Sequence, residues 1–494
     1  MSSNAATEQN ATEEGRRRPD WRGRPSGAEP GPAPRDRSSA VVLVLCAAAF
    51  MAMLDVFVVN VAFTDIGASF PGSALSSLSW VLNAYAIGYA ALLIPAGRLA
   101  DRYGRKVSFL AGLTVFTLAS AACAAAPSLW WLVALRVVQA AGAAALTPAS
   151  LGLLLTVLPP DRRAGAVRVW ATTSSVAAAV GPVVGGALVE LSWRWVFLIN
   201  LPIGVVVFWV ARRLIPRSPA DASAQGDAVR MPDLLGVAVL AATIGAAALG
   251  LVKGGEWGWS SPTTLAVFAA ALIGAGCFMW RTLRHPSPVV DPALFRAPAF
   301  RWANLTVLTF CTAFGAAFPA VVLWLEQVAG FSAIRTGLAI LPGPTMVPIF
   351  AVVGRRLAAR VPAGRLVAAG NLVFGVGAIM LALGVSGHAA YATHVLPGWI
   401  VTGVGIGLAL PTMLTSATAA LPAEQAATGS AVVNTSRQLG YVLGVAILVA
   451  VLGAITGTPE QVQTGFRHAW LFIAVTAVLS AATALGSTPR KARS

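Results

Sequence analysis

The stretch Gly97-Arg98-Leu99-Ala100-Asp101-Arg102-Tyr103-Gly104-Arg105-Lys106 lies between two long apolar runs and decides how the chain is interpreted. Its glycines, Gly97 and Gly104, permit a tight turn between antiparallel helices. Asp101 lies among four cations, so its carboxylate can pair with an arginine or face the N-terminus of a neighbouring helix. Such a pairing can break and re-form in a conformational switch. The alternative is a solvated basic loop that only sets membrane topology.

The composition outside this stretch is that of a membrane protein. Hydrophobic residues make up 57% of the 494 positions and charged residues only 11%, whereas soluble domains carry about 25% charged residues. The net charge of +16 comes from short Arg and Lys clusters between apolar runs. These clusters form no continuous basic face, so nucleic acid is not an expected partner.

Apolar runs long enough to cross a bilayer, which takes about 20 residues, recur along the chain. They predict an all-α polytopic protein of about fourteen transmembrane helices. The lipid bilayer is therefore one of its expected partners. The expected spans are 40–63, 78–98, 107–127, 130–153, 167–189, 196–214, 233–252, 263–281, 302–325, 336–356, 364–385, 393–418, 427–453 and 467–487.

The loop charges set the orientation, because cytoplasmic loops are rich in Lys and Arg. With the N-terminus inside, most of the 35 Lys and Arg residues fall in the tails and inside loops, and Arg136 and Arg437 fall within spans. Both termini are therefore expected in the cytoplasm. The positive residues expected outside are Arg194, Lys253, Arg335 and Arg467.

A short repeated segment indicates that the chain has two related halves. The segment Arg98–Arg102 recurs as Arg356–Arg360, each time directly after a span on the inside face, and weak repeats of this kind are typical of transporters. The predicted organisation is a disordered cytoplasmic tail, a six-helix half, a linker with two inserted helices, a second six-helix half and a short tail. Their bounds are 1–39, 40–214, 215–301, 302–487 and 488–494.

The Gly97–Lys106 stretch resembles the signature loop between the second and third helices of the major facilitator superfamily, and further matches follow in order. Gly181-Pro182 with Gly185-Gly186 resembles the fifth-helix motif of its antiporters, although Ala177 stands where that motif expects Gly. The fourth-helix motif of the superfamily is resembled by Leu135-Arg136, Gln139, Gly142 and Ala143 to Ala145. Segments of the fourteen-helix drug:proton antiporters are similar to Leu54-Asp55 with Asn60-Val61-Ala62, and to Trp193 to Phe197 with Asn200 and Pro202. The second half matches mainly through Asn434, Arg437, Gln438 and Gly440.

Two ionisable residues inside spans carry the predicted proton coupling. An ionised Asp near a helix centre costs roughly 2.5–3.5 kcal/mol on insertion scales, so Asp55 is expected to line a cavity or a proton path. Burial alone favours its protonated form, whereas an aqueous cavity or a cationic substrate favours proton release. The resemblance associates Arg136 with proton coupling. A structural Asp bonded to a neighbouring helix, and an Arg that binds backbone carbonyls, are the alternatives.

The fifth-helix motif also has a physical reading of its own. Pro182 in mid-span removes one backbone hydrogen bond, and Gly185 and Gly186 allow a neighbouring helix to approach closely. By resemblance, this bend seals the packing on the cytoplasmic side and disfavours uncoupled leak.

Candidate residues of a substrate cavity come from both halves. Phe310, Phe314 and Phe318 repeat on one helix face, which suits either a drug-binding face or packing against helices and lipid. Glu326 ends its span, as a coupling group or a solvated terminus. The remaining candidates are Asn60, Tyr85, Tyr89, Gln139, Asn434 and Arg437.

No cofactor, metal or enzymatic activity is expected. The GxxxxGK[ST] phosphate loop is missing from the sequence, so protons rather than ATP are the expected energy source. HExxH, GxSxG and paired Cys/His ligands are missing too, and the four cysteines lie singly in apolar runs.

The sequence therefore predicts a multi-pass protein of the cytoplasmic membrane, acting as a monomer. It exports small amphipathic molecules, such as drugs, antibiotics or toxic metabolites, in exchange for protons by alternating access. One acidic group in an apolar cavity suits cationic substrates, but neutral and anionic ones stay open. The rival readings are an exporter of one natural product, a proton-coupled importer, and a non-transporting receptor or scaffold.

Overall fold

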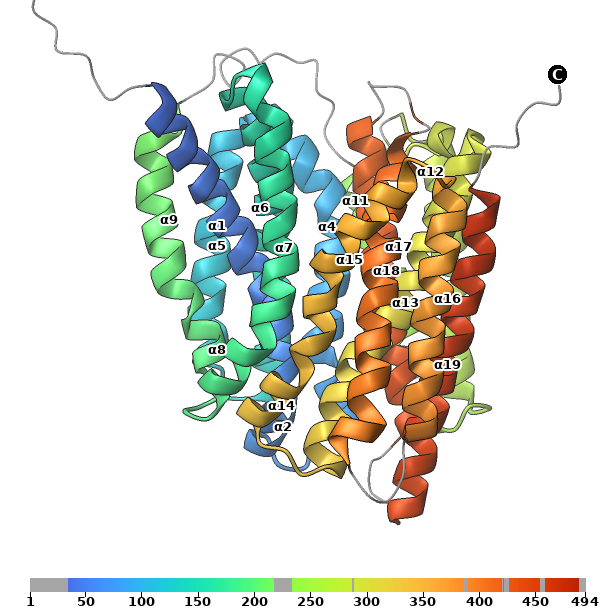
Figure 1. Cartoon of the computed structure of the whole chain (residues 1–494). Coiled ribbons are helices and arrows are strands. Elements are labelled where there is room, and N and C mark those ends of the chain that lie inside the picture. The colour runs from blue at the N-terminus through green and yellow to red at the C-terminus, as the bar shows by residue number, and fades with distance from the viewer. Residues whose placement is uncertain are drawn as a thin grey trace, which may run out of the picture.

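The computed structural model describes residues 34–216, 233–286, 288–384, 390–419, 421, 426–453 and 458–487, and all regular elements in these ranges are helices. They form two bundles that stand side by side (Figure 1). The first bundle contains α1 (Pro34–Val61), α2 (Phe63–Ser69), α3 (Leu75–Leu78), α4 (Trp80–Tyr103), α5 (Arg105–Ala124), α6 (Leu129–Val157), α7 (Pro160–Val189), α8 (Trp195–Leu198) and α9 (Asn200–Leu214).

Two helices, α11 (Leu234–Trp257) and α12 (Pro262–Arg284), and the short η1 (Pro292–Arg296) connect the bundles. The second bundle contains α13 (Pro298–Leu323), η2 (Trp324–Val328), α14 (Ala333–Ile340), α15 (Pro342–Ala358), α16 (Ala363–Gly384), η3 (Tyr391–Val395), α17 (Leu396–Ala419), α18 (Ala426–Leu452) and α19 (Pro459–Gly486).

Within the described residues, 13 helices are long and apolar enough to cross a membrane. The expected span 167–189 lies in α7, whose recorded apolar part, Val176–Val189, is shorter. The count of fourteen, and the side on which the termini lie, therefore stay predictions. The tail expected at 1–39 falls outside the described residues up to position 33, and α1 already begins at Pro34. The whole of the short tail expected at 488–494 also falls outside them.

The two bundles repeat one pattern of helix packing. In the first, α6 packs on α4 and α5, α1 packs on α7 and α9, and α5 packs on α9. In the second, α17 packs on α15 and α16, α13 packs on α18 and α19, and α16 packs on α19. The short repeat of Arg98–Arg102 as Arg356–Arg360 thus belongs to corresponding helices, because α4 and α15 hold the same place in their bundles.

The bundles meet along two seams, and the inserted helix α11 covers one of them. At this seam α4 contacts α18, and α11 packs on both. Ile87, Ile244 and Val442, one from each helix, belong to a single buried cluster. At its end α11 is tied to the first bundle, since Glu256 accepts a hydrogen bond from Ser76 and Lys253 Nζ donates one to Ser77 Oγ at 3.3 Å.

The signature loop turns at one glycine rather than two. Gly104 separates α4 from α5 with φ of 96°, a left-handed conformation that favours glycine. Gly97 lies inside α4, where an added Cβ would stand 3.7 Å from the Pro148 side chain. The expectation that Gly97 also forms the turn is wrong, because α4 continues to Tyr103.

At the second seam, glycines let α7 approach both α1 and the second bundle. An added Cβ at Gly181 would lie 2.6 Å from the Phe57 side chain, and one at Gly185 would lie 3.1 Å from Val58 Cα. Gly186 of α7 packs directly against the backbone of Ala333 in α14, and Gly337 of α14 packs against the backbone carbonyl of Pro182. The backbones of the two bundles therefore touch where the fifth-helix motif stands.

The position of this motif corrects one expectation. The helix α7 begins at Pro160, next to the end of α6 that contacts the signature loop, and Gly181–Gly186 lie toward its other end. The motif and α14 therefore lie at the end of the bundle away from that loop (Figure 1). The close packing expected on the side of the loop is therefore wrong in position, because the motif packs the two bundles together at the opposite end.

This packing predicts that Gly186→Ala destabilises the protein by about 1–3 kcal/mol, because the methyl group meets the Ala333 backbone. Thermal unfolding of the purified protein in detergent measures the effect. Gly165→Ala in the same helix is the control, since nothing lies within 4 Å of a Cβ there. Both changes gain similar helix propensity, so equal unfolding temperatures for the two variants would contradict the close approach.

Candidate functional site

A buried ion pair joins the two residues predicted to couple protons. Asp55 of α1 and Arg136 of α6 are each 1% exposed, and Arg136 Nη1 donates a hydrogen bond to Asp55 Oδ2 at 2.5 Å. The sequence did not predict this pairing, which places a guanidinium directly against the Asp55 carboxylate. Removing either partner would leave an uncompensated charge inside the bundle.

Three further polar side chains complete this cluster. Asp55 Oδ1 accepts hydrogen bonds from Gln139 Nε2 at 2.9 Å and from Asn200 Nδ2 at 3.1 Å. Gln139 Oε1 accepts one from Arg136 Nη1 at 2.7 Å, and Gln139 Nε2 also donates to Ser120 Oγ. Each oxygen of the Asp55 carboxylate therefore accepts at least one hydrogen bond, and the network fixes it on three neighbouring helices.

The guanidinium of Arg136 is held on its other sides as well. Its Nε donates to the Val81 carbonyl of α4 at 3.2 Å. Its central carbon stands 4.0 Å from the centre of the Tyr85 ring and 5.8 Å from that of Phe197. The carboxylate, the carbonyl and the ring faces together offset the cost of burying this cation.

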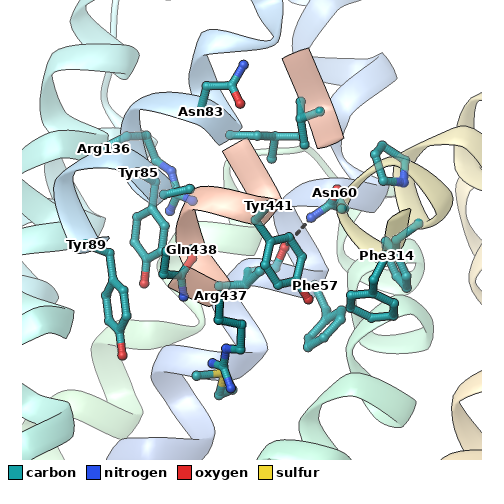
Figure 2. A pocket seen from close by; sticks show the side chains of 18 of the residues that line it. Phe57, Asn60, Asn83, Tyr85, Tyr89, Arg136, Phe314, Arg437, Gln438 and Tyr441 are labelled. Atoms are coloured by element: carbon teal, nitrogen blue, oxygen red, sulfur yellow. Dashed lines mark hydrogen bonds between the residues drawn. The ribbon is translucent and has the colours of Figure 1, made fainter. Parts of the chain in front are cut away.

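A central cavity opens beside this cluster, between the bundles. It has two lobes of about 80 Å³ and 130 Å³. Figure 2 shows the first lobe, with Arg437 and Tyr441 of α18 between the tyrosines of α4 and Phe314 of α13. Arg136 contributes to the wall of this lobe, so one side chain belongs both to the ion pair and to the cavity. The side chains common to both lobes are Met53, Phe57, Phe314, Phe318, Arg437 and Tyr441.

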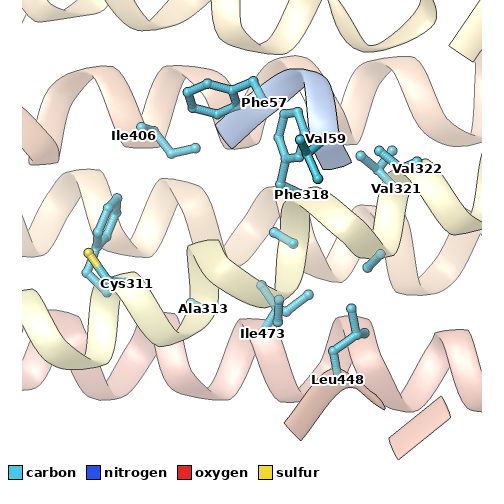
Figure 3. Close-up of a cluster of buried hydrophobic side chains, with 14 of the residues drawn as sticks. Phe57, Val59, Cys311, Ala313, Phe318, Val321, Val322, Ile406, Leu448 and Ile473 are labelled. Carbon is cyan, nitrogen blue, oxygen red and sulfur yellow. The ribbon is translucent and has the colours of Figure 1, made fainter. Parts of the chain in front are cut away.

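Most of the predicted cavity residues lie on these walls. The phenylalanine stripe faces the second lobe rather than lipid, and Phe310 and Phe318 are only 1% and 4% exposed. Figure 3 shows Phe318 against Phe57 of the other bundle, with ring centres 5.3 Å apart. The predicted residues that line one or both lobes are Asn60, Tyr85, Tyr89, Phe310, Phe314, Phe318 and Arg437.

Three predicted residues lie elsewhere. Gln139 belongs to the ion-pair cluster, and Asn434 donates to the Ser430 carbonyl of its own helix at 3.1 Å. Glu326 lies beyond the end of α13 in η2, a π-helical turn that lines neither lobe. Both of its carboxylate oxygens are buried, and no hydrogen bond reaches them within the described part of the chain.

Several wall residues were not predicted. Asn83 is fully buried beside the first lobe, and neither atom of its amide has a hydrogen-bond partner among the described residues. Gln438 follows Arg437 and lines the same lobe. Trp399 lines the second lobe and donates to the Ile340 carbonyl at 2.8 Å. Each of these is a polar or aromatic residue within an apolar run, which is a signal that the sequence does contain. That signal does not show which residues face the cavity, because the cavity forms only where the two bundles meet.

The signature loop forms contacts at the end of the first bundle. Asp101 pairs with Arg105 at 3.1 Å, which is one of the two expected arrangements. Arg105 Nη1 also donates to the Gly152 carbonyl of α6 at 2.9 Å, and Lys106 donates to the Arg212 carbonyl at the C-terminal end of α9 at 3.0 Å. Arg98 reaches the linker between the bundles, where it donates to the Pro288 carbonyl at 2.7 Å. The loop therefore ties α4 to α6, α9 and the linker.

The family model of the Major Facilitator Superfamily matches residues 45–445. The chain belongs to the major facilitator superfamily. It is a transporter rather than an enzyme, and a multi-pass protein of the cell membrane.

Curated relatives in this superfamily are similar over most of the chain. The multidrug resistance protein Stp of Mycobacterium tuberculosis is 34% identical over 410 residues, which cover 82% of this chain and 74% of that protein. The methylenomycin A resistance protein of Streptomyces coelicolor is 34% identical, with 87% and 90% covered. The cephamycin export protein CmcT of Amycolatopsis lactamdurans is 32% identical, with 89% and 90% covered.

Solved structures confirm the superfamily's fold. A bacterial homologue of the human lysosomal transporter Spinster, in an inward-facing and unoccupied conformation, is 18% identical with a TM-score of 0.62, covering 94% of this chain and 100% of that one. The D-xylose-proton symporter is 12% identical with a TM-score of 0.64, covering 91% and 98%. At these identities the similarity concerns the fold alone.

The ion pair predicts a large loss of stability when one partner is removed. Asp55→Ala leaves Arg136 charged and without its carboxylate, because arginine does not lose its proton in proteins. We expect a cost of about 3–5 kcal/mol, measured by thermal unfolding in detergent. Asp101→Ala, which removes the exposed pair with Arg105, is the control and is expected to cost at most about 1 kcal/mol.

The double variant Asp55→Ala/Arg136→Met sharpens this test, since it removes both charges at once. It should regain part of the stability lost in Asp55→Ala. Strictly additive losses from the two substitutions would show that the pair is not energetically coupled.

Proposed function

We propose that this transporter is a proton-coupled antiporter that exports small amphipathic organic molecules by alternating access. Protons move inward through Asp55 as substrate moves outward through the central cavity. One chain supplies both bundles and the whole cavity wall, so the proposed transport unit is a monomer.

The observation that carries the proposal is the place of Arg136 in both the ion pair and the cavity wall. A proton on Asp55 cancels the charge that holds Arg136 and leaves the guanidinium with one partner fewer. The cluster then has two arrangements, paired and unpaired, which differ by one proton. An antiporter needs such a group, whose proton occupancy follows the side to which the cavity opens.

The glycine seam supports the alternating part of this mechanism. The contacts of Gly186 with Ala333 and of Gly337 with Pro182 hold the two bundles together at the end away from the signature loop. Opening the cavity at that end requires these backbones to separate. Because no side chains intervene, the seam forms one closely packed contact, which suits a switch between two discrete states.

The free energy released by inward proton movement is sufficient to drive export. One proton that moves through 100 mV releases about 2.3 kcal/mol, which supports a gradient of roughly fiftyfold. The names of relatives, a multidrug resistance protein and a cephamycin export protein, favour export over import. Export of a single natural product is the second candidate, since relatives include a cephamycin export protein and a probable actinorhodin transporter.

Growth of a pump-deficient host that expresses the protein, across a panel of toxic compounds, identifies exported compounds and their range. Resistance to several unrelated scaffolds supports a multidrug exporter, and resistance to one scaffold supports a dedicated exporter. Import predicts the reverse result, greater sensitivity to the compounds that it carries.

The coupling step is tested in sealed vesicles with an imposed pH gradient and a compound from that panel. Asp55→Asn should lose the proton-driven accumulation of up to roughly fiftyfold per 100 mV, because the variant cannot carry the proton. Asp161→Asn, which removes an exposed carboxylate at the start of α7, should accumulate the compound as the unmodified protein does. Full accumulation by Asp55→Asn would disprove the assignment.

A further inference from the structure

The walls of the central cavity carry positive charge. Arg136 and Arg437 contribute to them, and no Asp or Glu lines either lobe among the described residues. Asp55 offsets the charge of Arg136, with which it forms an ion pair, so the uncompensated positive charge of the walls is that of Arg437. The Asp55 carboxylate is buried and already accepts hydrogen bonds from Arg136, Gln139 and Asn200, so it is not free to bind a cation. The sequence-based preference for cationic substrates therefore has no free carboxylate to support it.

Arg437 differs from Arg136 in that no described residue forms a hydrogen bond or an ion pair with it. Its side chain lines both lobes, and its Nε is buried without a hydrogen bond. No ion pair or hydrogen bond involves it within the described residues. The titratable side chains that line the two lobes with it are Tyr85, Tyr89, Arg136, Cys311 and Tyr441, and none of these residue types is an acid at neutral pH. An ionisable residue inside a membrane bundle normally has a partner.

We propose that the exported substrates carry a carboxylate or a similar anionic group, and that Arg437 binds it. This inference rests on the proposed export function and adds the substrate class. A guanidinium presents a planar fork of donors that matches a carboxylate with two parallel hydrogen bonds. The anionic group of the substrate thereby serves as the ion-pair partner that Arg437 lacks among the described residues.

The rest of the cavity fits the apolar part of such a molecule. Phe57, Phe314 and Phe318 line both lobes around Arg437 and offer aromatic surface from both bundles. Polar groups are few, and Gln438 and the unpartnered amide of Asn83 stand beside the first lobe. A mostly apolar wall with a small number of placed polar groups is the usual form of a ligand site.

Anion binding and proton coupling involve separate groups. Arg437 belongs to α18 of the second bundle, whereas Asp55 and its partners belong to the first, and no hydrogen bond joins the two sets. The charge preference of the cavity can therefore be measured without a pH gradient, and its outcome does not depend on whether transport is coupled to protons.

Three matched fluorescent probes test the inference on the purified full chain in detergent. Dansylglycine carries a carboxylate, dansylglycinamide is neutral, and monodansylated ethylenediamine carries an ammonium group. Binding is followed by energy transfer from tryptophan, because Trp399 lines the second lobe. We expect the carboxylate probe to bind about tenfold more tightly than the other two, as one charge-assisted contact gives.

Variants of Arg437 locate the effect. Arg437→Gln should remove the preference for the carboxylate probe over the neutral one, whereas Arg437→Lys should keep part of that preference. The matched control is Arg301→Gln, which removes the same charge from an exposed position on α13 and should bind all three probes as the unmodified protein does. Size-exclusion chromatography checks that each variant is folded.

Each other outcome overturns the inference. Equal binding of the three probes, tighter binding of the ammonium probe, or no binding of any probe by the unmodified protein would do so without any variant. A preference that survives in folded Arg437→Gln would also contradict it. Export of the ammonium probe in exchange for protons would contradict this inference but not the proposed antiport. Binding of the carboxylate probe without any proton exchange would contradict the proposed antiport but not this inference.

Discussion

The ion pair between Asp55 and Arg136 is the interaction on which the first bundle depends. Either charge alone would be costly when buried in an apolar bundle, and together they hold α1 against α6, while Asn200 connects them to α9. In the proposed mechanism, one proton on Asp55 cancels one charge of the same pair. The contact that stabilises the packing would then also respond to a proton, which would link the fold of this transporter to the proposed use of a proton gradient.

The glycine seam gives this local event a wider effect. Backbones of α7 and α14 touch at Gly186 and Gly337, so the bundles cannot separate gradually there. On the other side, α11 covers the contact between α4 and α18. The cavity thus lies between one closely packed seam and one that carries an inserted helix. The helix α1, which carries Asp55, packs on α7 and contacts α14, so it connects the ion pair with the glycine seam.

The sequence predicted the transmembrane helices better than the contacts between them. Apolar run length was enough to place the spans, and the rarity of charge inside them was enough to select Asp55 and Arg136. It did not reveal that these two residues pair, nor that Gln139 serves Asp55 rather than the cavity, since both facts require helices far apart in the chain to meet. For the same reason Asn83 and Trp399 were missed. The expectation that the fifth-helix motif packs the side of the signature loop was wrong, because the resemblance gave the motif a role but no position along its helix.

Infrared difference spectroscopy on acidification tests most directly whether Asp55 takes up the proton. The carbonyl stretch of a protonated carboxylic acid is separate from that of a carboxylate, and a buried acid differs from one in water. For the purified transporter, a buried-acid band should appear as the pH falls and should be missing in Asp55→Asn, while Glu326→Gln retains it. An unchanged band in folded Asp55→Asn, or no buried-acid band in the unmodified protein, would contradict the account.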